Sequence, residues 1–133
     1  MMYKSGQIMT KILLIDDSLT VRMELRSIFA DDAFEITEAS DGEQAIEAFK
    51  RDPNIDLIIC DYNMPGMDGL STLEEIYRIS EEHNFSSIML TTESSQVLKD
   101  KGRSIGVSGW LIKPFKKENL LKGVKTILSR KAA

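Results

Sequence analysis

The chain has 133 residues, of which 42% are hydrophobic and 29% are charged, and its formal net charge at pH 7 is −4. This length suits one compact domain, and this composition predicts a packed core rather than a disordered chain. The negative charge argues against a nucleic-acid-binding protein, and no apolar stretch approaches the ~20 residues that would cross a bilayer.

The first predicted elements are a tail, a strand and a helix. Residues 1–9 lack the continuous hydrophobic region of a secretion signal, so we expect a flexible N-terminal tail there. The run KILLID (11–16) shows no polar alternation, which is typical of a parallel strand covered on both faces. Apolar residues then recur at helical spacing, at Val21, Leu25, Ile28 and Phe29.

The later elements repeat this alternation of strand and helix. The run FEITEA (34–39) alternates apolar and polar residues, which predicts a half-exposed strand at the edge of a sheet. Asp41 and Gln44 form a capping box that starts a helix to about Lys50. Three more apolar runs without alternation predict strands covered on both faces: DLIICD (56–61), SSIMLT (86–91) and SGWLIK (108–113). We expect the remaining helices at 70–82, at 94–105 and around 120–129.

Five alternations of strand and helix predict an α/β fold with a mostly parallel sheet, three layers thick. We place a single domain at residues 10–130 and a C-terminal tail at 131–133, with no output domain attached. The single cysteine, Cys60, excludes an internal disulfide and fits a reducing compartment, so we expect a cytoplasmic protein. Basic residues near the C-terminus alternate with apolar ones, which indicates the solvated face of a helix.

Polar residues end four of the predicted strands. The first strand ends in Asp16 and Asp17, and the others end in Asp61, Thr91 and Lys113. Each residue by itself could simply close its strand. Ligands of open α/β sheets, however, bind outside the carboxyl ends of the strands. We therefore expect three carboxylates, a hydroxyl and an ammonium group to share one edge of the sheet.

Three carboxylates with one lysine leave an excess of negative charge that a cation would balance. Oxygen ligands suit Mg²⁺, with Mn²⁺ as a second option. Mg²⁺ usually keeps waters and binds a phosphate oxygen beside one or two carboxylates, which points to a phosphoryl group as the ligand. A carboxylate at such a site can also act as a nucleophile and form an aspartyl phosphate.

Four motifs in this chain closely resemble the receiver domain of two-component response regulators: IDDS (15–18), DYNMPGMDG (61–69), LTTES (90–94) and GWLIKPF (109–115). The resemblance extends from Lys11 to Ser129. It implies a single doubly wound, five-stranded parallel sheet in the order 2-1-3-4-5, flanked by five helices, as in flavodoxin-like and CheY-like folds.

The resemblance also implies roles for the acidic residues. Asp61 matches the phosphoacceptor, and Asp16 and Asp17 match the acidic pair that binds Mg²⁺. Asp17 is expected to contact the metal directly and Asp16 to act through water. Asn63 matches the residue whose backbone carbonyl completes the metal shell.

Further residues match the switch of this family. Thr91 resembles the hydroxyl that closes on the phosphoryl group, and Lys113, before a cis Pro114, resembles the lysine that pairs with it. Trp110 occupies the position of the switch aromatic, although it could instead fill the core. Gly102, inside the predicted helix 94–105, indicates either a weakly held helix that moves in the switch or a poorly packed surface helix.

The resemblance implies a stand-alone signalling protein rather than an enzyme. A sensor histidine kinase of the CheA-like type would phosphorylate Asp61, and the phosphorylated monomer would bind a flagellar motor switch protein or another phospho-dependent target. One alternative is a phosphorelay intermediate that passes the phosphoryl group to a histidine phosphotransfer protein. Another is an aspartyl-phosphate phosphatase, but such enzymes carry a second aspartate where this chain has Asn63.

Overall fold

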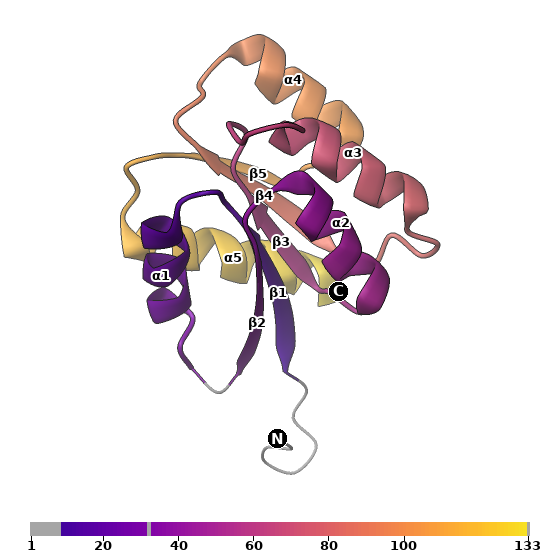
Figure 1. Cartoon of the computed structure of the whole chain (residues 1–133). Coiled ribbons are helices and arrows are strands. Elements are labelled where there is room, and N and C mark those ends of the chain that lie inside the picture. The colour runs from indigo at the N-terminus through magenta and orange to yellow at the C-terminus, as the bar shows by residue number, and fades with distance from the viewer. Residues whose placement is uncertain (1–8, 32, 133) are drawn as a thin grey trace.

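The computed structural model describes residues 9–31 and 33–132, so residues 1–8 of the predicted tail lie outside the described residues. Strands and helices alternate along the described chain (Figure 1). Their bounds are β1 (Thr10–Ile15), α1 (Leu19–Ile28), β2 (Phe34–Ala39), α2 (Gly42–Arg51), β3 (Leu57–Cys60), α3 (Gly69–Ile79), β4 (Ser86–Thr91), α4 (Gln96–Ile105), β5 (Gly109–Ile112) and α5 (Lys117–Ala132).

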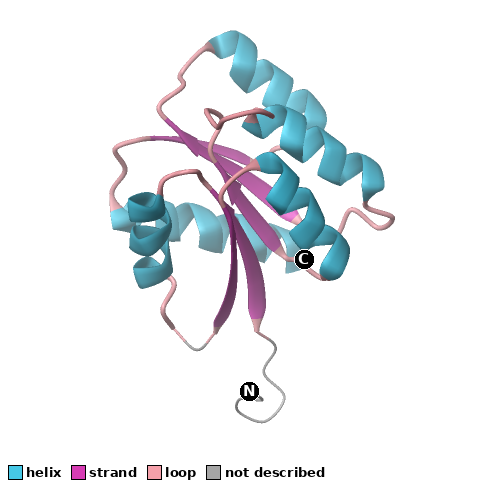
Figure 2. Ribbon diagram, in the orientation of Figure 1, coloured by secondary structure: helices cyan, strands magenta, loops and turns pink. Residues whose placement is uncertain are grey.

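The five strands form one sheet in the order β2-β1-β3-β4-β5, and every neighbouring pair is parallel. Helices α1 and α5 cover one face of the sheet, and α2, α3 and α4 cover the other (Figure 2). The fold predicted from the sequence, including its strand order, is therefore confirmed. None of the helices in residues 9–31 and 33–132 has the length and apolar character needed to cross a membrane.

The position of each strand in the sheet explains its burial. Residues Ile12–Ile15 of β1 and all four residues of β3 are buried, because both strands have neighbours on each side and helices on each face. Strand β2 is half-exposed at one edge of the sheet, as predicted. The prediction that residues 108–113 are covered on both faces is wrong, since β5 lies at the other edge and its residues are only partly buried or exposed.

Alternate side chains of β1 point to the two faces of the sheet and belong to separate cores. Leu13 and Ile15 pack with α2, α3 and α4, whereas Ile12 and Leu14 pack with α1 and α5. Because both sets are apolar, β1 shows no alternation in the sequence. The two aspartates that follow β1 are therefore attached to a strand buried on both faces.

Side-chain caps set where the helices begin. Ser18, Asp41, Asp68 and Ser95 each accept a hydrogen bond from the backbone amide three residues later. The Ser95 cap explains why α4 begins at Gln96 rather than at residue 94 as predicted.

Two helix ends differ from prediction. Helix α3 ends at Ile79, and the predicted extension to residue 82 is interrupted by Ser80, whose backbone is extended. His83 then adopts a φ of 51° within the connection to β4. Helix α5 continues to Ala132, beyond its predicted end at Ser129.

Candidate functional site

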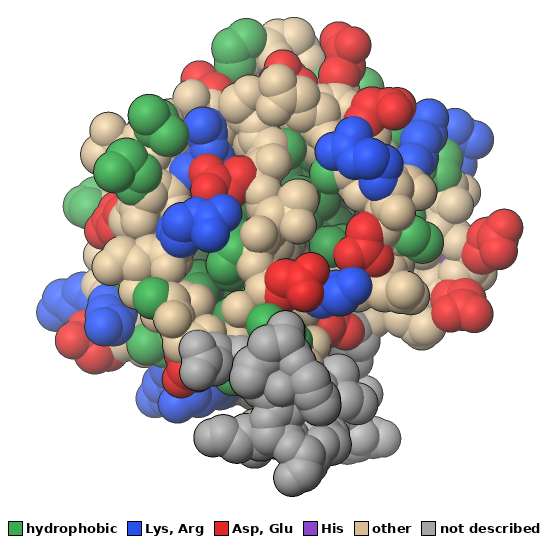
Figure 3. Space-filling model, turned by 60° about the horizontal axis from the view of Figure 1, so that its bottom comes forward, with side chains coloured by type: hydrophobic (Ala, Val, Ile, Leu, Met, Phe, Trp, Pro, Cys, Tyr) green, Lys and Arg blue, Asp and Glu red, His purple; other side chains and the backbone are tan. Residues whose placement is uncertain are grey.

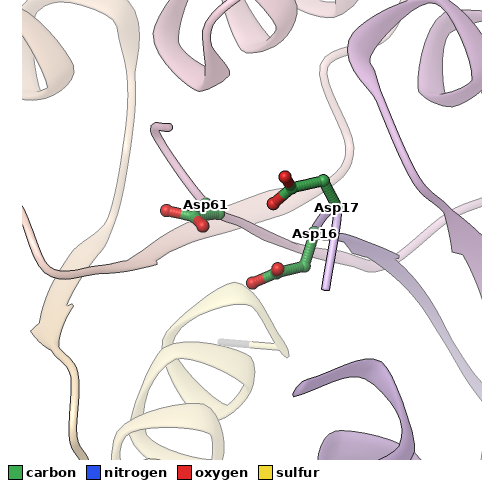
Figure 4. Close-up of side chains that lie close together, drawn as sticks. All are labelled: Asp16, Asp17 and Asp61. Atoms are coloured by element: carbon green, nitrogen blue, oxygen red, sulfur yellow. The ribbon is translucent and has the colours of Figure 1, made fainter. Parts of the chain in front are cut away.

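Three carboxylates meet where β1 and β3 end. Strands β1 and β3 pair in register, with Ile15 opposite Cys60, so the residues that follow them are neighbours. Asp16, Asp17 and Asp61 each offer an oxygen, and these oxygens lie within 4.8 Å of one another. Figure 4 shows Asp16 and Asp17 extending toward the side on which Asp61 lies. The structure therefore brings together the three acidic residues predicted from the sequence.

Asp16 is buried and held by several hydrogen bonds. The Ser18 amide donates to Asp16 Oδ1 over 2.9 Å, and Lys113 Nζ donates to Oδ2 over 2.8 Å. Burial raises the pKa of the Asp16 carboxyl and outweighs the opposing effect of these two donors. The ionised form of Asp16 is therefore costly without a further positive charge nearby.

Lys113, which follows β5, bonds to two of the carboxylates. Its ammonium group lies 2.8 Å from Asp16 Oδ2 and 3.2 Å from Asp61 Oδ2. Burial lowers the pKa of Lys113, but the bonds and charges of Asp16 and Asp61 raise it by more, so the net shift is upward. The Lys113–Pro114 peptide is cis, as predicted. Lys113 is therefore a protonated group facing the acidic residues.

Asp17 forms the open side of this acidic cluster, next to Asp61. Asp61 is buried, and its Oδ1 accepts a hydrogen bond of 3.2 Å from the Asn63 amide. Asp17 is exposed, and no residue within 9–31 and 33–132 donates a hydrogen bond to its carboxylate. A hollow of about 350 Å³ opens beside it, lined in part by Tyr62 and Asp68. A ligand can therefore reach the cluster from the Asp17 side.

The donor set fits a hard divalent cation. The cluster combines three carboxyl groups with one ammonium group, and every available ligand atom is an oxygen. Asp17 is the carboxylate with free lone pairs on the open side, whereas Lys113 already occupies one oxygen of Asp16 and one of Asp61. The cluster could therefore hold a metal ion.

The predicted switch residues Thr91 and Trp110 are connected to each other and to Asn63 through Glu93. Thr91 is fully buried, and its hydroxyl oxygen accepts a hydrogen bond of 3.3 Å from the Glu93 amide. The indole of Trp110 donates to the Glu93 carbonyl over 2.8 Å. Asn63 Nδ2 donates to the Glu93 carboxylate over 3.1 Å. Glu93, which the sequence indicates only as a residue flanking the site, therefore joins three predicted site residues.

Trp110 packs beneath α4 rather than in the acidic cluster. It is partly buried against the core that contains α2, α3 and α4. A Cβ added at Gly102 would lie 3.1 Å from the indole ring, so a side chain there would displace the indole or the helix. Gly102 thus has a packing role that neither interpretation from the sequence included. The sequence did hold a signal for this contact, since the largest side chain, Trp110, and the smallest, Gly102, fall in two successive elements.

The distribution of charged side chains on the surface agrees with the predictions made from the net charge and from the pattern of basic residues. Basic and acidic side chains are interspersed on the face shown in Figure 3, without a continuous basic surface. The lysines of α5 at positions 117, 122 and 125 are exposed, as expected for the solvated face of a helix. Neither observation favours a nucleic-acid interface.

Comparison with known proteins shows which family and which proteins this chain is similar to. Residues 12–125 match the family model described as the response regulator receiver domain. The transcriptional regulatory protein CpxR of Escherichia coli (strain K12) is 34% identical to the chain over 122 residues, which cover 92% of the chain and 50% of CpxR. The chain therefore spans about half the length of this relative.

Two solved structures are similar to this chain over most of its length and most of their own. The chemotaxis protein CheY4 of Vibrio cholerae, crystallized at low pH, has a TM-score of 0.83 and 35% identity, covering 90% of this chain and 98% of CheY4. A chain from the CheX–CheY–BeF₃–Mg²⁺ complex of Borrelia burgdorferi has a TM-score of 0.83 and 30% identity, covering 90% of each chain.

Proposed function

The chain belongs to the response regulator receiver domain family, and from that premise we propose that Asp61 accepts a phosphoryl group from a histidine kinase when Mg²⁺ is bound. The observation that carries this proposal is the convergence of Asp16, Asp17 and Asp61 with Lys113 at one edge of the sheet. Receiver domains are signalling domains, and we assign no enzymatic turnover to this one.

Each residue of the cluster has a role in the proposed transfer. An oxygen of Asp61 bonds to phosphorus while the bond from phosphorus to the imidazole nitrogen of the kinase breaks. Lys113, already 3.2 Å from Asp61 Oδ2, is placed to pair with the added negative charge. Asp17, Asp16, Asp61 and the Asn63 carbonyl would hold Mg²⁺. When bound, Mg²⁺ would neutralise charge on the transferred group.

The residues around Glu93 would report the phosphorylated state. The Thr91 hydroxyl would turn from the Glu93 amide to an oxygen of the phosphoryl group. Because the Glu93 carbonyl also accepts the Trp110 hydrogen bond, a shift of this loop would be felt beneath α4. We therefore assign Thr91 and Trp110 to a switch that changes the surface around α4 and β5.

The partners in this proposal are a CheA-like histidine kinase and a target that binds the phosphorylated form, such as a flagellar motor switch protein. Similarity to CheY4 along nearly its whole length supports a chemotaxis role, as does similarity to a chain of the CheX–CheY complex. Similarity to CpxR is equally compatible with control of a separate output domain. Affinity capture of partners with and without phosphorylation would separate a chemotaxis target from a histidine phosphotransfer protein.

A phosphatase with an aspartyl-phosphate intermediate is less well supported. Such an enzyme needs a general acid near the nucleophile, and Asn63, two residues after Asp61, cannot exchange a proton usefully near neutral pH. Its side chain donates to Glu93 instead. Turnover of a phosphate ester above background would favour this alternative.

The chemistry can be tested with a small phosphodonor. Intact-mass spectra recorded after incubation with acetyl phosphate and Mg²⁺ should show one phosphoryl adduct. The adduct should be absent when Mg²⁺ is chelated and absent in Asp61→Asn. An adduct that persists in Asp61→Asn would contradict the assignment of Asp61.

A further inference from the structure

Two arginines of α1 share one carboxylate at the end of β2. Arg22 Nε donates to Glu38 Oε1 over 2.9 Å, and Arg26 Nε donates to Glu38 Oε2 over 2.7 Å. Glu38 lies on the same face of β2 as Phe34 and Ile36, which pack with α1 and α5, so its carboxylate faces α1. The exposed fractions of the side chains are 14% for Arg22, 27% for Glu38 and 52% for Arg26.

Arg22 makes one contact that Arg26 does not. Its Nη1 donates a hydrogen bond of 2.7 Å to the main-chain carbonyl of Asp16. The main-chain amide of Asp16 donates in turn to the carbonyl of Ala39, over 3.1 Å. The end of β2 therefore holds the main chain of Asp16 at two points. Ala39 binds the Asp16 amide directly, and the Glu38–Arg22 pair binds the Asp16 carbonyl.

The hydrogen bond from Arg22 acts on the peptide group that joins Asp16 to Asp17. The Asp16 carbonyl and the Asp17 amide belong to one planar group, so holding the carbonyl fixes the direction in which the chain enters Asp17. Within the described residues, no hydrogen bond reaches the Asp17 carboxylate itself. The main chain is therefore what orients the one carboxylate that is open to a ligand.

We propose that Arg22, anchored by Glu38, is a positioning residue that orients the Asp16–Asp17 peptide so that the acidic cluster can bind a divalent cation. The inference rests on the proposed function, because it assigns a further residue to the same site. Neither Arg22 nor Glu38 touches the cation in this account. Their effect passes through the main chain of Asp16.

A positioning role and a purely electrostatic role of Arg22 predict opposite changes in the Kd for Mg²⁺ when its guanidinium group is removed. The guanidinium charge lies near the acidic cluster and would repel a cation, so its removal would tighten Mg²⁺ binding if charge alone mattered. Removal should weaken Mg²⁺ binding if the orientation of the peptide matters more. A role confined to packing α1 on β2 would lower stability and leave the Kd of the folded protein unchanged.

The test compares Arg22→Ala with Arg26→Ala, since each variant removes one ion pair to Glu38 and only the first removes the bond to Asp16. ¹H–¹⁵N NMR spectra titrated with MgCl₂ would yield the Kd of each folded variant. The Kd should rise about tenfold in Arg22→Ala, as for loss of an outer-shell partner. It should change by less than about twofold in Arg26→Ala. An unchanged or lower Kd in Arg22→Ala would overturn the proposal.

Glu38→Gln provides a second variant if Arg22→Ala does not fold. It keeps the size of the side chain and weakens the anchor of Arg22, so the Kd should rise roughly threefold, as for partial loss of an outer-shell contact. An unchanged Kd would contradict the proposal. A wild-type protein that binds no Mg²⁺ would overturn both this inference and the proposed function. A wild type that binds Mg²⁺ and is phosphorylated, with Arg22→Ala equally competent, would overturn the inference alone.

Discussion

The two halves of the candidate site are built on very different packing. The acidic residues follow β1 and β3, where Ile12–Ile15 and Leu57–Cys60 are all buried. Of the two predicted switch residues, Thr91 ends the buried strand β4, whereas Trp110 lies in β5 beside α4; of the described residues in α4 and β5, only Gly102 is buried. We refer to β1 and β3 with the carboxylates as the platform, and to α4 and β5 as the switch region. Weakly buried elements are those that open or move at low cost.

The contrast shows how one domain can combine fixed chemistry with a movable surface. Carboxylates that share a cation need constant separations, and strands buried on both faces provide them. Two links cross to the switch region: Lys113 reaches Asp16 and Asp61, and Glu93 joins Asn63 to Trp110. A change at Asp61 therefore has short routes to the elements that are easiest to displace.

The largest expected effect tests the packing contrast itself. Ile59 in β3 is 1% exposed and Ile112 in β5 is 36% exposed. Truncation of a buried isoleucine leaves a cavity, so Ile59→Ala should lower the free energy of unfolding by about 3 kcal/mol. Ile112→Ala should lower it by less than about 1 kcal/mol, because that side chain is already partly in water. Urea denaturation measures both, and equal losses would break the comparison.

The next effect concerns the open side of the platform. Asp17→Ala removes one carboxylate of the proposed Mg²⁺ site, so the Kd for Mg²⁺ should rise by roughly thirtyfold, equivalent to about 2 kcal/mol. Without Mg²⁺ the same change relieves repulsion among three carboxylates and should stabilise the fold by about 0.5 kcal/mol. Thermal denaturation with and without MgCl₂ tests both signs. A variant less stable than the wild type in the absence of metal would contradict the account.

A smaller effect should appear in the pH dependence of stability. Burial raises the pKa of Glu38, but hydrogen bonds from Arg26 and Arg22 lower it by more, so it lies below the ordinary value of 4.5. An acid with a lower pKa in the folded state stabilises the fold above the unfolded pKa and loses that contribution as the pH falls through the folded pKa.

The wild type should therefore exceed Glu38→Gln in stability by about 1 kcal/mol at neutral pH. The difference should shrink as the pH falls below 4.5. Urea titrations of both proteins at several pH values measure this. A difference that grows toward low pH would refute the assigned sign, and an unchanged Trp110 emission in Glu38→Gln would show that the effect does not reach the switch region.

The smallest change in stability is expected at Gly102. Alanine gains about 1 kcal/mol in helix propensity over glycine. Its methyl group, however, would stand 3.1 Å from the Trp110 ring, so the indole must give way. We expect these effects nearly to cancel, leaving a net change below about 0.5 kcal/mol, together with a clear shift in Trp110 emission. A stabilised variant with unchanged emission would show that the contact beneath α4 is unimportant.

The platform was predictable because its information is local in the sequence. Uninterrupted apolar runs indicated β1 and β3, and the residues that follow them, Asp16, Asp17 and Asp61, needed only parallel pairing to meet. The strand order came from the resemblance to a family rather than from any periodicity. The catalytic and metal-binding roles of these residues stay predictions.

The switch region was predicted less well because its features depend on contacts between distant positions. The sequence of β5 looks like that of a central strand, yet its place at the sheet edge leaves it partly exposed. The reason for Gly102 lies in Trp110, on the next strand, and the connecting role of Glu93 appears only once the loops are placed. Arg22 was missed for the same reason, since it lies in α1 and its partner Glu38 lies in β2.

The coupling between platform and switch region can be tested with the only tryptophan of the chain. The fluorescence of Trp110 should be followed while Mg²⁺ and then acetyl phosphate are added to the wild type and to Asp61→Asn. The account predicts a Mg²⁺-dependent change on addition of the phosphodonor that is absent in Asp61→Asn. Unchanged fluorescence in a wild type that mass spectra show to be phosphorylated would contradict it, because phosphorylation would then occur without reaching the switch region.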